Sequence, residues 1–172
     1  LGDGMQLMFV DRHVVHELSG HRGHAEMAKR GLKMRNPELS LGSMDHVVST
    51  TPGSRGGNTP NADRIIETFR SESRRHGMKV YDIGEDGQGI VHVIGPETGF
   101  TIPGTLLVCG DSHTCTHGAL GALACAAPVG ALSRCGGQPL GCGCCHGRPL
   151  AAAGGAGGAG GPFAAGQEVV SQ

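Results

Sequence analysis

Residues 105–117, TLLVCGDSHTCTH, form the stretch that most restricts how this chain can fold. They begin as a short apolar run over residues 106–109, which Gly110 ends. Acid, hydroxyl, imidazole and thiol side chains then follow, with no bulky apolar residue among them. A buried strand that leads into a glycine-headed polar loop is a frequent way to place chemistry at the carboxyl end of a parallel sheet. The alternative is a strand that ends in an ordinary Asx or Ser/Thr turn.

Length and charge exclude several classes of protein. The 172 residues suffice for one domain, or for one lobe of a larger protein. The formal net charge of −1 argues against nucleic acid or an anionic membrane as the main partner. No apolar run has the length of a membrane span, and no signal peptide is visible. None of the seven cysteines precedes Cys109, which favours reduced thiols in a cytoplasmic protein over a disulfide scaffold.

Composition changes sharply near Ala124. Residues 1–124 hold 26 of the 29 charged side chains and contain the periodic segments. Residues 125–172 hold 13 glycines and 10 alanines, and residues 151–161 consist of these two types alone. Such a segment buries too little apolar area to offset the entropy lost on ordering. We therefore predict one partial α/β domain over residues 1–124 and a disordered, low-complexity tail over residues 125–172.

Strands that alternate with helices predict an α/β domain with a mostly parallel sheet. The clearest helix covers residues 62–76, with Asn61 as its cap and Gly77 as its end. A second, surface helix is expected over residues 21–30, capped by Ser19, and a third is expected to start within residues 118–124. Besides the run at 106–109, strands are expected at residues 6–11, 43–49, 78–83 and 90–94.

Four ordered motifs carry a family resemblance. They are FVDRHVVHEL (9–18), SMDHVVST (43–50), VYDIGEDGQGIVHVIG (80–95) and LVCGDSHTCTHGALGALA (107–124). Over about residues 5–124 the chain resembles the amino-terminal part of large subunits in the aconitase family, most closely those of its leucine-pathway branch. The resemblance implies an incomplete three-layer α/β/α lobe. It also implies isomerisation of 2-isopropylmalate and 3-isopropylmalate by loss and return of water, in leucine biosynthesis.

The family resemblance also implies a cofactor and a partner. Its members hold a [4Fe–4S] cluster through three cysteines, and a separate small subunit completes the site. The cluster ligands of the family are expected downstream of the Gly110–His113 motif, in a region that this chain lacks. Cys109 and Cys115 do not match them: Cys109 reads as a small buried strand residue and Cys115 as a loop thiol.

The resemblance assigns roles to seven residues, none of them a metal ligand. Hydroxide departs more easily when a nearby acid delivers a proton, and a carboxylate beside an imidazole favours its protonated form. Asp45 with His46, and Asp111 with His113, match the Asp–His pairs of the family. His92 matches a third catalytic imidazole. The substrate-binding positions are Ser112, for a substrate carboxylate, and His16, for a polar contact.

Simpler interpretations exist for the same residues. Asp45 is also suited to a turn at a strand end, His92 to a satisfied core histidine, and Ser112 to a bond with the loop backbone. The remaining histidines of the first 124 residues are interpreted as surface or structural, namely His13, His21, His24, His76 and His117.

Two alternative functions remain open at this stage. One is a related hydro-lyase of the same family with a different hydroxy acid as substrate. The other is an inactive, truncated remnant whose tail binds metal incidentally, because Cys142, Cys144, Cys145 and His146 lie within residues 141–147. Without the cluster ligands, the isolated chain is expected to be inactive.

Overall fold

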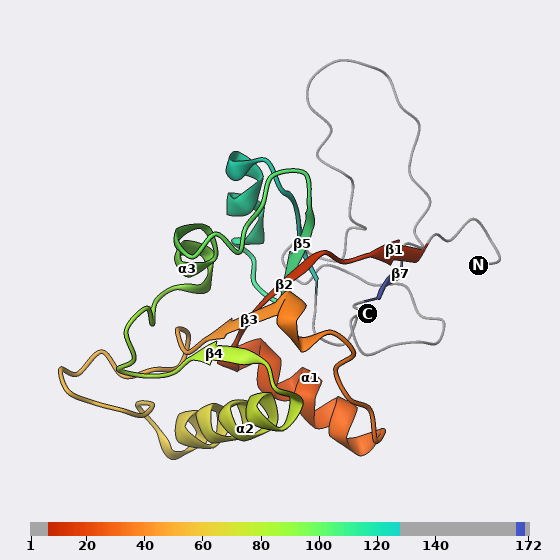
Figure 1. Ribbon diagram of the computed structural model, residues 1–172. Coiled ribbons are helices and arrows are strands. Elements are labelled where there is room, and N and C mark those ends of the chain that lie inside the picture. Colours follow the sequence, from red (N-terminus) through yellow and green to blue (C-terminus); the bar gives the residue numbers. More distant parts are fainter. Residues whose placement is uncertain (1–6, 128–167, 171–172) are drawn as a thin grey trace.

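The computed structural model describes residues 7–127 and 168–170, and its centre is a five-stranded parallel sheet. The strand order across the sheet is β4-β3-β2-β5-β6 (Figure 1). These strands are β2 (Arg12–His16), β3 (Ser40–Ser43), β4 (Lys79–Tyr81), β5 (Leu106–Cys109) and β6 (Leu123–Ala126). A separate parallel pairing joins β1 (Leu7–Phe9) to β7 (Glu168–Val170).

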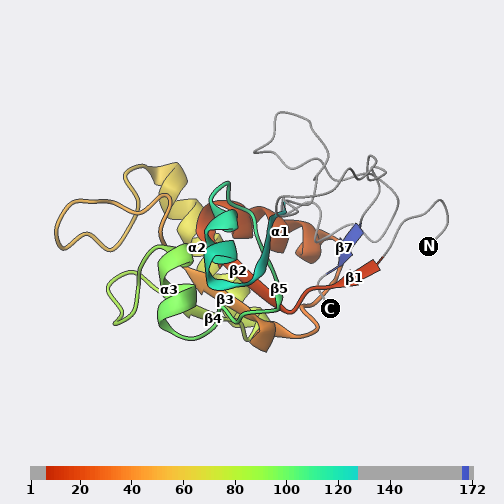
Figure 2. The ribbon, with the colours of Figure 1, turned by 90° about the horizontal axis from the view of Figure 1, so that it is seen from above.

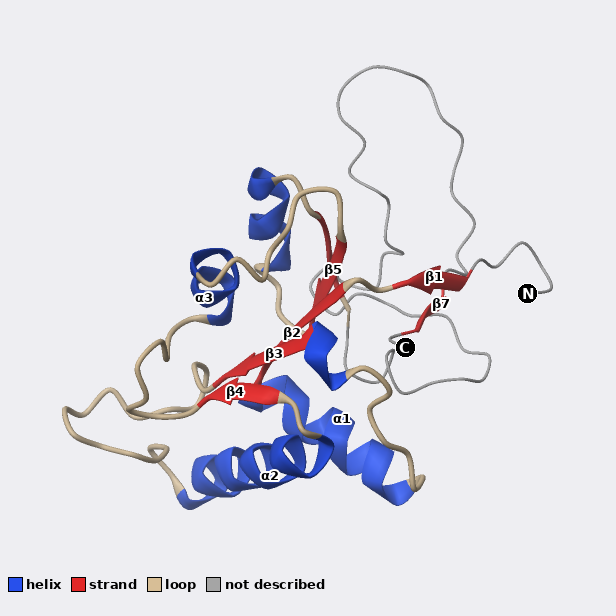
Figure 3. Ribbon diagram, in the orientation of Figure 1, coloured by secondary structure: helices blue, strands red, loops and turns tan. Residues whose placement is uncertain are grey.

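Helices cover both faces of the sheet (Figures 1 and 3). The helices α1 (Glu17–Lys29) and α2 (Pro60–His76) pack together against one face. On the other face lie α3 (Val91–Glu97) and the 3₁₀ helix η2 (Thr114–Leu120), which are nearest the viewer in Figure 2. A short 3₁₀ helix, η1 (Pro37–Leu39), precedes β3. The α/β class and the three-layer α/β/α arrangement predicted from the sequence are confirmed.

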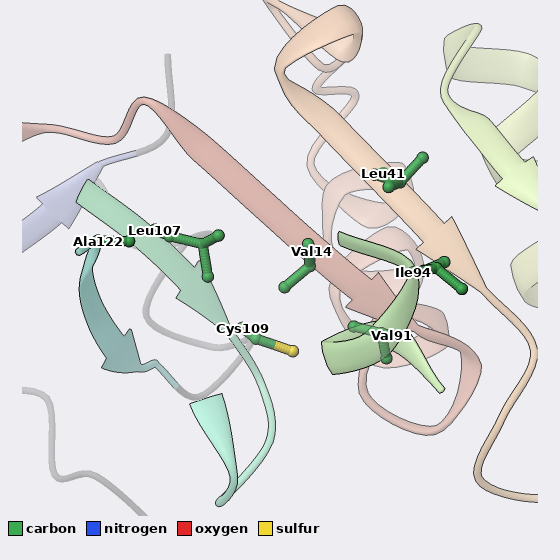
Figure 4. Packing of buried hydrophobic residues seen from close by; sticks show 7 residues of the cluster. All are labelled: Val14, Leu41, Val91, Ile94, Leu107, Cys109 and Ala122. Carbon is green, nitrogen blue, oxygen red and sulfur yellow. The ribbon is translucent and has the colours of Figure 1, made fainter. Parts of the chain in front are cut away.

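Two apolar layers hold the helices on the sheet. Successive side chains of a strand point to opposite faces, so Val14 and Val15 of β2 enter different layers. Val14 packs with Leu107, Val91 and other residues beneath α3 (Figure 4). Val15 packs with Phe69 and further residues on the side of α1 and α2. Because both faces are covered, the central strand is buried from Val14 to His16.

The helix α2 ends where the sequence predicts and begins two residues earlier. The hydroxyl oxygen of Thr59 accepts a hydrogen bond from the Ala62 amide at 3.1 Å, so Thr59 is the cap rather than Asn61. Pro60 occupies the first helical position, where its missing N–H has no cost. At the other end, Gly77 adopts a left-handed conformation with φ of 74°.

Several predicted boundaries in the first half of the chain are wrong. The strand expected at residues 6–11 is replaced by β1 and by the sheet strand β2, which starts at Arg12. The helix α1, which was expected at residues 21–30 with Ser19 as its cap, begins directly after β2 at Glu17. Its cap is His16, which has an extended backbone conformation. The strand expected at residues 43–49 lies earlier, as β3, so that Asp45 and His46 lie in a loop after it.

Two assignments in the second half are also wrong. The run predicted as a strand at residues 90–94 lies mostly in helix α3, with His92 in its first turn. A short apolar run of this length fits a buried helix as well as a strand, and packing on the sheet decides between them. The helix expected to begin within residues 118–124 is instead the end of η2, a left-handed Gly121 with φ of 82°, and the strand β6.

The described residues stop short of most of the tail. None of the described helices is long and apolar enough to cross a bilayer. The strand β6 continues to Ala126, past the composition change at residue 124. The prediction of disorder and the Cys–His segment at residues 141–147 both lie outside the described residues, apart from residues 125–127 and 168–170.

A close approach between α1 and α2 gives a test of this packing. A Cβ atom added at Gly20 would clash with a ring carbon of Phe69 and lie 2.8 Å from a methyl carbon of Val15. Overpacking of this kind costs about 1–3 kcal/mol, and alanine regains at most about 1 kcal/mol through helix propensity. We therefore expect Gly20→Ala to lower the free energy of unfolding, measured by urea denaturation. Gly118→Ala is the control, since its added Cβ meets no atom within 4 Å. A Gly20→Ala variant as stable as the wild type would contradict the packing.

Candidate functional site

Polar residues gather where the carboxyl ends of three neighbouring strands meet. His16 is the last residue of β2, Asp45 and His46 follow β3, and Asp111 to His113 follow β5. From β2 the chain continues to β3 on one side, whereas β5 lies on its other side and continues outward to β6. Connections that diverge in this way leave a crevice at the carboxyl edge of a parallel sheet. The sequence-predicted residues are therefore brought to one edge.

His46 lies between two carboxylates. Its Nδ1 is 2.5 Å from an Asp45 oxygen, and its Nε2 is 3.0 Å from Oδ2 of Asp111. An ionised carboxylate only accepts, so both ring nitrogens donate and the ring is an imidazolium. The hydrogen bond to Asp45 is the main cause that raises the pKa of His46 to about 9, against the opposing effect of burial. The His46 side chain is 28% exposed, so it reaches the solvent side of the site.

Asp111 connects the loop after β3, the helix α3 and its own loop. Its Oδ1 accepts from Nε2 of His92 at 2.7 Å and from the backbone N–H of His113 at 2.6 Å, while its Oδ2 faces His46. Burial opposes ionisation, but these hydrogen bonds outweigh it and hold the pKa of Asp111 well below its usual range. Asp45 makes a similar link, since its Oδ2 accepts from the Val91 amide at 2.8 Å and fixes the loop after β3 to the start of α3.

Glu17 holds the loop that carries Asp45 and His46. Its carboxylate is fully buried and accepts three backbone N–H groups, from Asp45 at 2.9 Å, His46 at 2.7 Å and Val47 at 2.5 Å. A buried charge is tolerated only when it is hydrogen-bonded in this way. Glu17 is not among the site residues predicted from the sequence. Its signal was its place immediately after the central strand, where a helix starts at the edge on which the site lies.

His16 lies beneath His46 rather than at the open surface. The two rings stack with centroids 3.7 Å apart and an interplanar angle of 20°. Nε2 of His16 lies 2.9 Å from the Ser19 hydroxyl and 3.3 Å from the Gly110 carbonyl oxygen. Burial, followed by the charge of His46, lowers the pKa of His16. Within the described residues its Nδ1 has no hydrogen-bond partner.

Ser112 and His113 form the exposed rim of the site. The His113 side chain is 79% exposed, and its Nδ1 lies 3.2 Å from the Ser112 hydroxyl and 3.3 Å from Oδ1 of Asp111. Thr114 is buried, and its hydroxyl donates to the Asp111 carbonyl at 2.7 Å, which keeps the loop turned. The His113 side chain is therefore accessible from solvent, while the hydrogen bond of Thr114 holds the loop backbone in place.

His117 is a second residue that the sequence analysis did not place in the site. It was interpreted as surface or structural, and the structure buries it completely behind His92. Nε2 of His117 lies 2.9 Å from Nδ1 of His92. Burial, followed by the nearby His92, lowers the pKa of His117 to about 4. Its only sequence signal was that it closes the polar run after β5.

The three described cysteines do not converge on one point. Cys109 is buried on the α3 side of the sheet, where burial raises the pKa of its thiol. Cys125 packs into the layer on the opposite face, and Cys115 is exposed on η2. The metal-ligating types that do cluster among the described residues are His16, Glu17, Asp45 and His46. Glu17 and His46 already use their polar atoms in the contacts above.

The charge of His46 gives a prediction about pH. A pKa raised from 6.5 to about 9 means that the charged ring stabilises the fold fully below pH 6.5 and loses this contribution as the pH rises through about 9. We expect Asp45→Asn to lower the pKa of His46 by one unit or more, on the order of the loss of a charged hydrogen bond, when it is measured by NMR titration. Asp86→Asn, on an exposed loop, is the control. An unchanged His46 titration in Asp45→Asn would refute the assignment.

The buried Glu17 gives a prediction about stability. Glu17→Gln replaces one acceptor oxygen by an amide that faces backbone N–H groups, and removes the charge that they solvate. We expect a loss of about 1.5–3 kcal/mol in the free energy of unfolding, measured by urea denaturation. Glu97→Gln, at an exposed position at the end of α3, should change stability by less than about 0.5 kcal/mol. Equal effects from the two substitutions would show that Glu17 does not hold the loop.

Known proteins match this chain over the same region. A family model described as the aconitase family (aconitate hydratase) matches residues 2–132, which is more than half of the chain. The 3-isopropylmalate dehydratase large subunit 1 of Bradyrhizobium diazoefficiens is 48% identical over 124 residues. That match covers 72% of this chain and 26% of the relative, so the chain spans about a quarter of the curated relative's length. With its parallel sheet and its edge of paired carboxylates and imidazoles, the chain belongs to the aconitase family.

Proposed function

We propose that this chain supplies acid and substrate-binding side chains for the interconversion of 2-isopropylmalate and 3-isopropylmalate by dehydration and rehydration, in leucine biosynthesis. The relative from Bradyrhizobium diazoefficiens is named a 3-isopropylmalate dehydratase. The observation that carries the proposal is the imidazolium of His46, held between Asp45 and Asp111 at the sheet edge. Such a group suits the step that is hardest in a dehydration.

His46 is proposed as the general acid. Hydroxide is a poor leaving group, and its departure becomes easier when a proton reaches the oxygen as the C–O bond breaks. A pKa of about 9 keeps His46 protonated at neutral pH, and Asp45 orients the ring and stabilises its charge. In the reverse direction the neutral ring takes a proton from the incoming water. Among the described residues we assign none to removal of the carbon-bound proton.

The neighbouring residues are proposed to bind and orient the substrate. The exposed His113 ring and the Ser112 hydroxyl form a rim suited to a substrate carboxylate. His92 with Asp111 forms the second Asp–His contact at this edge of the sheet, and we propose it as a catalytic imidazole. His16 is 2% exposed, so we propose that its contact with substrate runs through the His46 ring stacked on it.

The described cysteines do not fit the cofactor of the family. Members of the aconitase family generally hold a [4Fe–4S] cluster, whose thiolate ligands must lie close together. Cys109 and Cys125 occupy apolar layers on opposite faces of the sheet, and Cys115 is exposed on η2. The other four cysteines lie outside the described residues. The described residues therefore offer no ligand set for such a cluster.

A partner and a compartment follow from the same proposal. The matched relative is named a large subunit, and we propose that a small subunit completes the site of this chain as well. The described cysteines are free thiols, which supports a reducing compartment, and we propose the cytoplasm.

Substrate binding gives a direct test of the proposed function. We expect either isopropylmalate isomer to shift the NMR signals of His113 and His46, because a carboxylate at the rim would contact both rings. Ser112→Ala should weaken this binding about tenfold, since it removes one hydrogen bond to a charged group. The isolated chain is expected to be inactive, so turnover is compared only where anaerobic iron–sulfur reconstitution with a dehydratase small subunit gives a measurable rate. There, His46→Gln should lower the rate about 100-fold or more, with binding retained.

The controls separate this proposal from its alternatives. Glu97→Gln, remote from the edge, should leave binding and turnover unchanged. Larger shifts with another hydroxy acid, such as citrate, would indicate a related hydro-lyase of the family. Signals of His46 and His113 that do not move with any of these acids would refute the proposed function.

A further inference from the structure

Behind His92 lies a line of buried polar side chains that the proposed reaction does not use. The Thr101 hydroxyl is 2.9 Å from Nδ1 of His117, and Nε2 of His117 is 2.9 Å from Nδ1 of His92. Nε2 of His92 is in turn 2.7 Å from Oδ1 of Asp111. Thr101 is 9% exposed, His117 0% and His92 9%, so this line is shielded from solvent along its length.

The hydrogen bonds along this line have a definite direction. Asp111 only accepts, so Nε2 of His92 carries a proton. Between Nδ1 of His92 and Nε2 of His117 there is room for one proton, and one of the two rings must donate it. If His92 donated at both nitrogens, it would be a buried cation on the same carboxylate as the charged His46, which is costly. The arrangement with one charge has His117 as the donor.

His117 then determines the next step of the line. Burial lowers its pKa to about 4, so at neutral pH the ring carries a single N–H. When that proton is on Nε2, facing His92, Nδ1 is a bare acceptor. The Thr101 hydroxyl, 2.9 Å away, is the donor that satisfies it. Every polar atom of this line then has a partner of the right kind, as buried polar atoms require.

The backbone of α3 is shaped around this line. A Cβ atom added at Gly95 would lie 2.8 Å from Oγ1 of Thr101 and 3.1 Å from Cε1 of His117. Gly95 therefore lets helix α3 approach the two side chains closely. The His92 and His117 rings meet edge to face, with centroids 5.1 Å apart and an interplanar angle of 71°. Packing and hydrogen bonding together leave each ring one orientation.

We propose that Thr101 and His117 are positioning residues that fix the tautomer and orientation of His92, so that its Nε2–H faces Asp111. The role of the His92 tautomer in dehydration rests on the proposed function. The tautomer itself does not depend on that function. A His92 ring flipped by 180° would place Cδ2 and Cε1 where Nδ1 and Nε2 now lie, and would lose both hydrogen bonds. Neighbours that orient a catalytic imidazole in this way set which nitrogen faces the substrate.

Histidine-labelled ¹⁵N NMR of the chain at neutral pH tests the proposal without any turnover. We expect His92 to be protonated on Nε2 and bare on Nδ1, and His117 to show the same tautomer. A ¹⁵N–¹⁵N coupling across the hydrogen bond should connect Nε2 of His117 to Nδ1 of His92. A doubly protonated His92, a proton on its Nδ1, or the absence of this coupling would overturn the proposal.

A matched pair of variants separates positioning from simple packing. His117→Gln keeps a side-chain N–H that can donate to His92, whereas His117→Leu fills the space without one. We expect the Nδ1 signal of His92 to keep its hydrogen-bonded position in His117→Gln and to lose it in His117→Leu. Equal His92 spectra in the two variants would overturn the proposal. If His117→Leu does not fold, the wild-type coupling still decides.

Thr101 provides a second pair, and turnover a separate readout. Thr101→Ser should leave the His117 tautomer unchanged, and Thr101→Val should shift its Nδ1 signal by removing the donor. Where the dehydration assay gives a rate, His117→Leu should lower kcat about tenfold to a hundredfold with little change in KM, and His117→Gln should restore most of it. If the wild-type tautomers are as expected but the chain binds no isopropylmalate, the proposed function is rejected and the positioning proposal is retained.

Discussion

The carboxylate of Asp111 is the interaction on which the rest of the site depends. It faces His46 from the loop after β3, His92 from α3 and the His113 amide from its own loop. Those three segments are far apart in sequence, and each is fixed to the others through this one group. Because it is held ionised by its donors, Asp111 also sets which nitrogens of His46 and His92 carry protons.

The sheet topology explains why such a group can exist at this edge. The carboxyl ends of β2, β3 and β5 are adjacent, and the chain leaves them in opposite directions. Polar loops there do not disturb the apolar layers, because the strand side chains alternate between the two faces below. Glu17 completes the edge: a buried carboxylate at the start of α1 solvates the backbone of the loop that carries His46. The same helix start therefore ends the strand and supports the site.

The sequence was informative where local signals and tertiary packing agree. The strand before Gly110, the helix that ends at Gly77 and the polar loop at Asp111 have strong local patterns, and the structure contains all three. The segment around His92 was wrong, since its apolar run fits a strand and a helix equally well and only packing on β2 and β5 selects the helix. The roles of Glu17 and His117 depend on partners 28 and 25 residues away, such as Asp45 and His92, and no local pattern encodes those contacts.

Histidines at this edge differ in chemistry because their surroundings differ. His46 lies between two carboxylates and holds its proton to about pH 9, while the buried His117 has a pKa lowered to about 4. His92 and Asp111 separate the two, so a charged ring and a neutral ring are kept at opposite ends of one hydrogen-bonded line. Groups of one type whose environments push their pKa values apart take different roles in catalysis. In the proposed function the charged ring therefore gives up a proton at the sheet edge, and in the proposed positioning the neutral ring holds its neighbour in place.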